Sequence, residues 1–385
     1  MTVREDILKD IKRVVIKIGS SVISNREKGR SLLECGLSLD WVRHYAHKIK
    51  GIRDKGYDVV LVSSGAIMAG RERLEFGRAN LTVPEKQACA AIGQSFLMHT
   101  YEKAFEKKGL MVAQILLSHD DLGNRRRYLN AKHTIEELLE KGVIPIINEN
   151  DSVTVEEIKI GDNDSLSATV ACLVDAQLLI ILSDVEGLYD RDPSLKNKTE
   201  KAQLISHVSK VNEDIERIAG KSKNRLTVGG MLTKVQAAKK TMSFGIPTLV
   251  VNGLDEKVIE NIFAGKEVGT LFWSGKGKIR DRKHWIAHTL KPAGTLTIDE
   301  GARKALVERE KSLLPAGLIK VKGDFEFGNA LTLLDESGKE IGRGLVNYNS
   351  RDLERIKGMK TSAVRNLMEE SFYEEVIHRD DLVIF

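Results

Sequence analysis

Short hydrophobic runs, rich in valine and isoleucine and separated by stretches with helical spacing, constrain the fold of this chain more than any other feature. The runs are Val14–Ile18, Val59–Val62, Val112–Leu117, Ile144–Ile147, Leu178–Leu182 and Thr248–Val251. Continuous apolar runs of this length are typical of strands that are buried on both faces of a parallel sheet. Because helical patterns lie between them, the sequence predicts an α/β fold, a three-layer α/β/α sandwich around a mainly parallel sheet.

Three of the intervening helical patterns are well defined. One carries Val42, Tyr45, Ile49 and Ile52 at helical spacing. A second is opened by Pro84, which suits a first helical turn, and its apolar positions are Ala88, Ile92, Leu97 and Phe105. A third covers Asn130–Lys141 and is closed by Gly142.

The pattern changes after Trp273, which predicts a second domain. Residues 274–278, SGKGK, are typical of a linker. Strand-like runs follow at Gly294–Ile298, Leu318–Val321, Ala330–Leu334, Ile341–Val346 and Val376–Phe385, and Asp335–Gly338 fits a hairpin turn between two of them. We therefore expect a sandwich domain over residues 1–273, a linker over 274–290 and a small, mostly-β domain over 291–385.

Composition and length exclude several classes of protein. Three cysteines with no CxxC pair among 385 residues exclude a disulfide framework and a cysteine zinc ribbon, and they indicate a reducing, cytoplasmic setting. The sequence predicts no membrane helix, and the charged N-terminus is not a secretory signal. The formal net charge of +5 is small for this length and does not by itself indicate nucleic-acid binding.

Small and polar residues follow four of the predicted strands. These segments are Lys17–Ser21, Ser63–Ala66, Asn148–Asp151 and Ser183–Asp184. Ligands of parallel sheets bind outside the carboxyl ends of the strands, so we expect the binding site there. Glycines in the first two segments let an anion approach backbone N–H groups at helix N-termini, which favours phosphate.

Three charged residues near these segments each allow two interpretations. Lys17 is either a buried lysine with an anionic partner or a lysine whose ammonium reaches solvent. Asp164 precedes a predicted helix over Ser165–Val174, so it fits either a helix cap or a carboxylate that orients a substrate or lysines. Val228–Lys234 opens another helix, either as a phosphate cradle or as a flexible loop with an exposed lysine.

Several standard motifs are absent. No GxGxxG follows a strand, which argues against a dinucleotide dehydrogenase, and neither HExxH nor GxSxG occurs. Gly220–Ser222 has the tail of a phosphate-binding P-loop, but Ile215 stands where that motif requires glycine, so we interpret it as a surface turn.

Taken together and in order, six motifs make the chain similar to the glutamate 5-kinase family of the amino-acid-kinase superfamily. They are Lys17-Ile-Gly-Ser-Ser, Ser63-Ser-Gly-Ala-Ile, Asn148-Glu-Asn-Asp, Gly161-Asp-Asn-Asp, Ser183-Asp and Gly229-Gly-Met-Leu-Thr-Lys. The tail resembles the family's C-terminal PUA domain through Ser312-Leu-Leu-Pro-Ala-Gly, Gly323-Asp-Phe, Tyr348-Asn-Ser and His378-Arg-Asp-Asp. Ser183 and Val228 depart from the family pattern, in which threonine is common at both positions.

The resemblance implies phosphorylation of the side-chain carboxylate of L-glutamate by ATP with Mg²⁺, the first step of proline biosynthesis. It places Lys17 and Lys234 beside the transferring phosphoryl group, with Asp164 holding the lysines. It assigns glutamate binding to Ser64, Asp151 and Asn163. It assigns ATP contacts to Lys17, Ser183, Asp184, Val228, Gly229, Gly230, Met231, Leu232, Thr233 and Lys234. No protein ligand of Mg²⁺ is predicted, because ATP phosphates and water hold this ion readily.

The expected chemistry agrees with the residues. The glutamate side chain is ionised at neutral pH, with a pKa of about 4.3, so the reaction needs no general base. Its difficulty is repulsion between two anions, which lysines, Mg²⁺ and helix N-termini relieve. Asp151 suits the free amino group of glutamate, which the substrate of acetylglutamate kinase lacks.

The resemblance also implies partners. It implies a homo-oligomer, feedback inhibition by proline, and delivery of the labile acyl phosphate to glutamate-5-semialdehyde dehydrogenase.

One alternative belongs to a different class, an RNA-binding protein that acts through the C-terminal domain. Residues 276–283 carry five basic residues against one acidic residue. However, residues 276–385 hold 20 Lys and Arg against 18 Asp and Glu, a balance that argues against a nucleic-acid platform.

Overall fold

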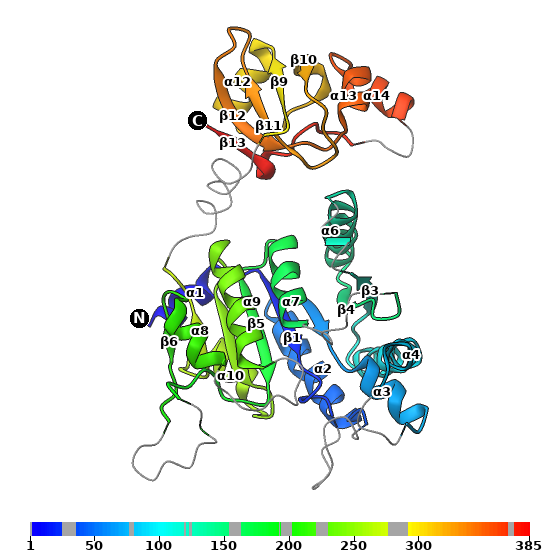
Figure 1. Cartoon of the computed structure of the whole chain (residues 1–385), viewed down its shortest axis with the longest axis vertical. Coiled ribbons are helices and arrows are strands. Elements are labelled where there is room, and N and C mark those ends of the chain that lie inside the picture. Colours follow the sequence, from blue (N-terminus) through cyan, green and yellow to red (C-terminus); the bar gives the residue numbers. More distant parts are fainter. Residues whose placement is uncertain are drawn as a thin grey trace. The chain divides into compact units, whose positions relative to one another are not determined.

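The computed structural model describes residues 2–24, 36–76, 81–118, 121–122, 125–153, 163–191, 193, 202–220, 230–275, 292–368 and 373–385. The chain divides into two compact units, one formed by residues up to 276 except for 124–127, and the other mainly by residues 277–385 (Figure 1).

The N-terminal unit is built on an eight-stranded sheet. Its strands are β1 (Arg13–Ile18), β2 (Asp58–Ser63), β3 (Val112–Leu117), β4 (Ile144–Glu149), β5 (Leu178–Ser183), β6 (His207–Val208), β7 (Thr248–Asn252) and β8 (Thr270–Phe272). Their order is β3-β4-β2-β1-β5-β7-β8-β6, and every pairing is parallel except the one between β7 and β8. The prediction of a mainly parallel sheet is confirmed.

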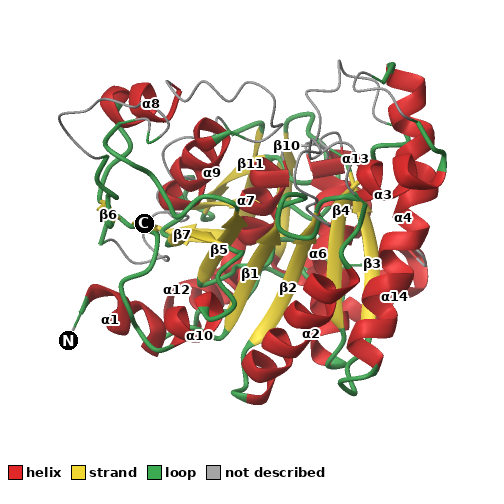
Figure 2. Cartoon of the chain, turned by 90° about the horizontal axis from the view of Figure 1, so that it is seen from below, coloured by secondary structure: helices red, strands yellow, loops and turns green. Residues whose placement is uncertain are grey.

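Helices cover both faces of this sheet (Figure 2). One face packs against α1 (Val3–Lys9), α2 (Leu39–Asp54), α3 (Ala66–Arg73), α4 (Val83–Glu106) and α10 (Val258–Phe263). The other packs against α6 (Arg125–Glu140), α7 (Asn163–Leu173), α8 (Glu213–Gly220) and α9 (Met231–Ser243). In β1, Val14 and Ile16 belong to the first core and Val15 to the second, as the alternation of a strand requires. The three-layer sandwich is therefore confirmed.

Helix α4 begins near Pro84 as predicted, but the prediction of which of its residues face the core was partly wrong. Ala88 is exposed, and Ile92 is 42% exposed. The buried face contains Cys89 and Gly93 instead. The backbones of α3 and α4 approach closely at Gly93 and at Gly70 of α3, so the side of α4 that faces α3 is the side of Cys89 and Gly93.

The C-terminal unit has a five-stranded sheet of order β10-β9-β11-β12-β13. Its elements are β9 (Gly294–Ile298), α12 (Glu300–Arg309), β10 (Leu318–Lys322), β11 (Ala330–Leu334), β12 (Glu340–Leu345), α13 (Ser350–Ile356), α14 (Thr361–Met368) and β13 (Leu382–Ile384). The predicted hairpin joins β11 to β12, and Gly338 adopts a φ of +84° there. The predicted strand Val376–Phe385 was too long, because Arg379–Asp381 forms a 3-10 turn.

The boundaries predicted between the two domains stay a prediction, because residues 276–291 lie outside the described residues. Within the described residues, no helix combines the length and the apolar character that crossing a membrane requires.

The contact between α3 and α4 gives a test of the fold. A Cβ added to Gly93 would lie 1.8 Å from the carbonyl oxygen of Ala66, so Gly93→Ala must push the helices apart. We expect the free energy of unfolding, measured in urea, to fall by about 3 kcal/mol. Gly51→Ala on α2 is the matched control, because its added Cβ meets no atom within 4 Å. This control should gain up to about 1 kcal/mol, and equal stability of the two variants would contradict the packing.

Candidate functional site

The alternation of β1 determines which helices Lys17 can reach. Val15 contributes to the core beneath α7 and α9, and Lys17 follows it by two residues, so both side chains lie on the same face of the sheet. The first turn of α7 carries Asp164, and α9 carries Lys234. Helix α7 begins at Asn163, earlier than predicted, so Asp164 lies inside its first turn.

These elements bring both lysines onto one carboxylate. Lys17 Nζ lies 2.8 Å from Asp164 Oδ1, and Lys234 Nζ lies 3.1 Å from Asp164 Oδ2. Thr233 Oγ1 also donates a hydrogen bond to Oδ2, at 2.8 Å. The exposed fractions of Lys17, Asp164 and Lys234 are 7%, 1% and 4%, so neither ammonium extends into solvent. The cluster is a buried group of two positive charges and one negative charge.

The charges of the cluster maintain the ionised form of its carboxylate. Burial by itself raises the pKa of Asp164, but the positive charges of Lys17 and Lys234, together with the hydrogen bond from Thr233, outweigh burial and hold that pKa well below its ordinary value. Asp164 is therefore an anion at every physiological pH and can pair with both lysines.

Glycines leave space beside the lysines. A Cβ added to Gly19 would lie 3.5 Å from Lys17 Nζ and 3.1 Å from the carbonyl oxygen of Leu182. A Cβ added to Gly230, which precedes the first turn of α9, would meet no atom within 4 Å. The N-terminus of a helix offers free N–H groups and a positive dipole end, so this arrangement suits an anionic group. The predicted residues Val228 and Gly229 lie outside the described residues.

A second polar cluster surrounds Asn163. Three acceptors share the two hydrogens of its Nδ2: the carbonyl oxygen of Ser63 and Ser64 Oγ, both at 2.9 Å, and Asn148 Oδ1 at 3.0 Å. Asn163 is 5% exposed, and its Oδ1 has no hydrogen-bond partner among the described residues. A buried amide oxygen of this kind is satisfied when a ligand brings a donor. The structure thus brings Ser64 and Asn163 together.

Asp151 follows β4 in a turn and does not join this cluster by a hydrogen bond to Ser64 or Asn163. Burial, together with the negative charge of Glu149, raises the pKa of Asp151 to about 7. A carboxylate with this pKa is half protonated near neutral pH, and a cationic partner would restore its charge.

The remaining predicted residues lie at the end of β5 and the start of α9. Ser183 is buried, and its Oγ donates to Asp184 Oδ1 at 3.4 Å. Leu232 is 40% exposed, while Met231 packs against the core. Leu232 and Met231 carry no polar side chain, so only their backbone groups can hold a polar ligand.

Sequence reasoning missed polar residues that support the Asn163 cluster. Tyr101 on α4 shares a buried hydrogen bond of 2.9 Å with Ser63 Oγ, and Gln94 on the same helix accepts from Asn148 Nδ2 at 2.8 Å. Asn148 belongs to a strand-end motif and could have been found from it. Gln94 and Tyr101 occur inside a helical pattern, where nothing in the sequence distinguishes them.

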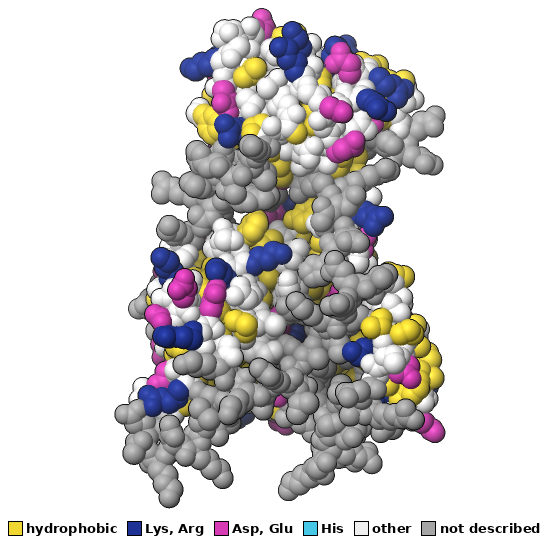
Figure 3. Space-filling model, in the orientation of Figure 1, with side chains coloured by type: hydrophobic (Ala, Val, Ile, Leu, Met, Phe, Trp, Pro, Cys, Tyr) yellow, Lys and Arg dark blue, Asp and Glu magenta, His cyan; other side chains and the backbone are white. Residues whose placement is uncertain are grey.

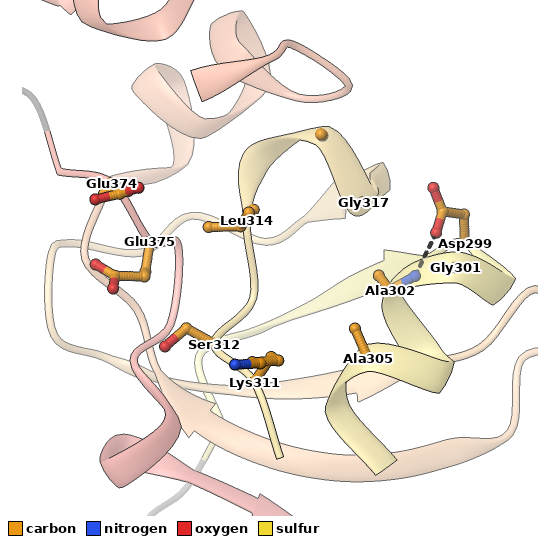
Figure 4. Close-up of a pocket in the computed structure, with 11 residues that line it drawn as sticks. Asp299, Gly301, Ala302, Ala305, Lys311, Ser312, Leu314, Gly317, Glu374 and Glu375 are labelled. Carbon is orange, nitrogen blue, oxygen red and sulfur yellow. Dashed lines mark hydrogen bonds between the residues drawn. The ribbon is translucent and has the colours of Figure 1, made fainter. Parts of the chain in front are cut away.

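The C-terminal unit contains a separate pocket of about 550 Å³ (Figure 4). Glu374 and Glu375 lie on one side of it and Asp299 on the other, where Asp299 accepts a hydrogen bond from the backbone of α12. Lys311 is the basic residue among its lining residues. The excess of carboxylates makes this pocket unfavourable for a phosphate group.

Asp164 gives a prediction about stability. Asp164→Asn leaves two buried lysines without a counter-charge, so the free energy of unfolding at pH 7 should fall by about 3 kcal/mol. Because folding lowers the pKa of Asp164, its contribution is complete above about pH 4 and is lost as the pH falls further. Urea unfolding should therefore show a difference between variant and wild type that shrinks below pH 4, and a difference that is independent of pH would contradict this account.

Comparisons with known proteins place the chain in a family. A model of the amino acid kinase family matches residues 12–252, and a model of the PUA domain matches residues 294–368. The chain is 46% identical over 381 residues to the glutamate 5-kinase of Geobacter metallireducens. This match covers 99% of this chain and 100% of that protein. It is 45% identical over 372 residues to the glutamate 5-kinase of Thermoanaerobacter pseudethanolicus, which covers 97% of each.

A crystal structure of UMP kinase from Bacillus anthracis matches 69% of this chain and 97% of its own, at 18% identity and a TM-score of 0.45. The two family models together match most of the chain, and the glutamate 5-kinases match nearly all of it. The chain therefore belongs to the amino acid kinase family and, within it, to the glutamate 5-kinase family with a C-terminal PUA domain.

Proposed function

We propose that this chain transfers the γ-phosphoryl group of ATP to the side-chain carboxylate of L-glutamate, which yields L-glutamyl 5-phosphate in the first step of proline biosynthesis. The observation that carries the proposal is the pairing of Lys17 and Lys234 with one buried carboxylate. Membership of the glutamate 5-kinase family supports the choice of substrate.

The lysine cluster suits a transfer between two anions. The attacking carboxylate is already ionised, so the protein needs only to neutralise charge and position the reactants. Lys17 and Lys234 supply fixed positive charge for the transferring group, and Asp164 keeps the two ammonium groups side by side against their mutual repulsion. Because the cluster is buried, this charge acts in a medium of low dielectric constant, where it has more effect than in water.

Glutamate would be held by the Asn163 cluster and Asp151. Ser64 Oγ and the unpartnered Oδ1 of Asn163 offer hydrogen bonds, and Asp151 offers a carboxylate to the α-ammonium group. The ammonium group would lower the pKa of Asp151 from about 7, so binding of the substrate and ionisation of Asp151 support each other.

ATP would lie along the N-terminus of α9, with Ser183, Asp184 and the run Val228–Lys234 as its contacts. Mg²⁺ bound with ATP would neutralise phosphate charge. Among the described residues, no group of three or more His, Cys, Asp or Glu side chains could hold a metal ion. Mg²⁺ keeps its waters readily, so phosphates and water would hold it in this proposal.

The same proposal includes the setting and partners of the enzyme. We propose a cytoplasmic homo-oligomer that proline inhibits and that delivers its product to glutamate-5-semialdehyde dehydrogenase. Proline resembles cyclised glutamate, so its site would lie at or near the glutamate site. We also propose domain boundaries at residues 273 and 291; both lie between the end of the amino acid kinase match at residue 252 and the start of the PUA match at residue 294.

The RNA-binding alternative has little support in the C-terminal unit. On the face drawn in Figure 3, the Lys and Arg side chains of this unit are interspersed with Asp and Glu. The pocket of this unit has an acidic lining. The basic run at residues 276–283 lies outside the described residues.

An ATP-dependent hydroxamate assay tests the proposed activity, because hydroxylamine traps acyl phosphates. We expect product with L-glutamate and little with N-acetylglutamate or aspartate. Preference for N-acetylglutamate would contradict the role given to Asp151, and no product from any of the three would refute the proposed function.

Loss of either lysine should reduce turnover without unfolding the chain. Lys17→Ala and Lys234→Ala each remove one donor to the transferring group, and we expect kcat to fall roughly a hundredfold. Lys239→Ala on α9 is the control, because Lys239 lies at the surface and pairs with Glu216. Turnover of either variant near that of the control would exclude the lysine from catalysis.

Asp151 should make glutamate binding depend on pH. Because its pKa is about 7 in the free protein, protonation below pH 7 removes the partner of the α-ammonium group. The KM for glutamate should rise as the pH falls from 8 to 6, while the KM for ATP changes less. Asp151→Asn should raise the KM for glutamate by roughly tenfold and abolish the dependence of this KM on pH. A variant that keeps the wild-type pH profile would show that another group titrates.

A further inference from the structure

Helix α4 contributes a side chain, Gln94, to the polar network at the ends of β2 and β4. Gln94 follows Gly93, where α4 packs tightly against the backbone of α3. Its Oε1 accepts a hydrogen bond of 2.8 Å from Nδ2 of Asn148, which is itself 2% exposed. Gln94 therefore connects α4 to this polar network through Asn148.

Backbone groups show which atom of each of the two asparagine amides is the acceptor. The N–H of Glu149 donates to Asn148 Oδ1 at 2.9 Å, and a backbone N–H can only donate. Asn148 must therefore turn its oxygen toward Glu149 and its Nδ2 toward Gln94. The carbonyl oxygen of Ser63 can only accept, so Asn163 must turn its Nδ2 toward Ser63.

The orientation of Asn163 leaves its Oδ1 as a buried acceptor that has no partner in the part of the chain that the structure describes. Asn148 Oδ1 receives a hydrogen bond from Asn163 Nδ2 at 3.0 Å, so Asn148 supports that orientation. The Nδ2 of Asn148 also needs an acceptor in this orientation, because an unpaired buried N–H group is costly. Gln94 Oε1 is that acceptor.

We propose that Gln94 is a positioning residue for glutamate: acting through Asn148, it holds the amide of Asn163 so that Oδ1 accepts a hydrogen bond from the substrate α-ammonium group. The inference rests on the proposed function. Gln94 acts through the Asn163 cluster and not through the lysine cluster, so it tunes glutamate binding separately from ATP binding.

Steady-state kinetics of Gln94 variants test this proposal. Gln94→Leu removes the acceptor, and the KM for glutamate should rise about tenfold while the KM for ATP stays unchanged. Gln94→Glu keeps an acceptor for Asn148 Nδ2 and should show a smaller rise in this KM. If the leucine variant does not fold, the glutamate variant still tests the proposal. Thr100→Val on the same helix is the control, because its hydroxyl donates only to the helix carbonyl of Phe96. The control should leave both KM values unchanged.

A double-mutant cycle separates positioning from a general loss of packing. In the Asn163→Ala background, Gln94→Leu should add little to the KM for glutamate, because its target is gone. Equal effects of Gln94→Leu in both backgrounds, or a rise in both KM values, would overturn the proposal. A wild-type protein that forms no hydroxamate from glutamate would refute the proposed function and the inference with it. Wild-type activity combined with an unchanged KM in both Gln94 variants would refute the inference alone.

Discussion

The site depends on the attraction of two buried ammonium groups to one buried carboxylate. Lys17 and Lys234 come from a strand and a helix that are far apart in the sequence, and without Asp164 their like charges would repel each other in a medium of low dielectric constant. The carboxylate compensates only one of the two charges, so the cluster retains an excess positive charge. Desolvating that excess is costly unless an anion shares the site, which is why the arrangement favours a phosphate ligand.

Two neighbouring residues of α7 connect the two parts of the proposed site, the lysine cluster and the Asn163 cluster. Asp164 holds the lysines, and Asn163 holds the polar cluster that includes Ser64 and Asn148. Because both residues lie in the first turn of one helix, a shift of α7 would move the phosphoryl side and the glutamate side together. The layers on the two sides of the sheet also contribute differently: α7 and α9 supply Asp164 and Lys234, whereas α4 supplies the amide and hydroxyl groups of Gln94 and Tyr101.

Much of the fold follows from the sequence because buried parallel strands give continuous apolar runs. Strands β6 and β8 were missed because they have only two and three residues, and such short runs give no periodic signal. The strand-end motifs pointed to Lys17 and Ser64, and two predicted helix starts pointed to Asp164 and Lys234. The family resemblance implied that Asp164 holds both lysines, but the residue patterns alone did not determine it. That sharing depends on the packing of α7 against α9. Gln94 could not be predicted, because a polar residue in an amphipathic helix is ordinarily exposed to solvent.

A crystal structure with L-glutamate and a non-hydrolysable ATP analogue would test the central claim most directly. The account predicts that Nζ of both lysines lies within hydrogen-bond distance, about 2.7–3.2 Å, of oxygens on the terminal phosphate, with Asp164 still between them. An ammonium group of residue 17 or 234 that pointed away from that phosphate would contradict the account, whatever family the chain belongs to.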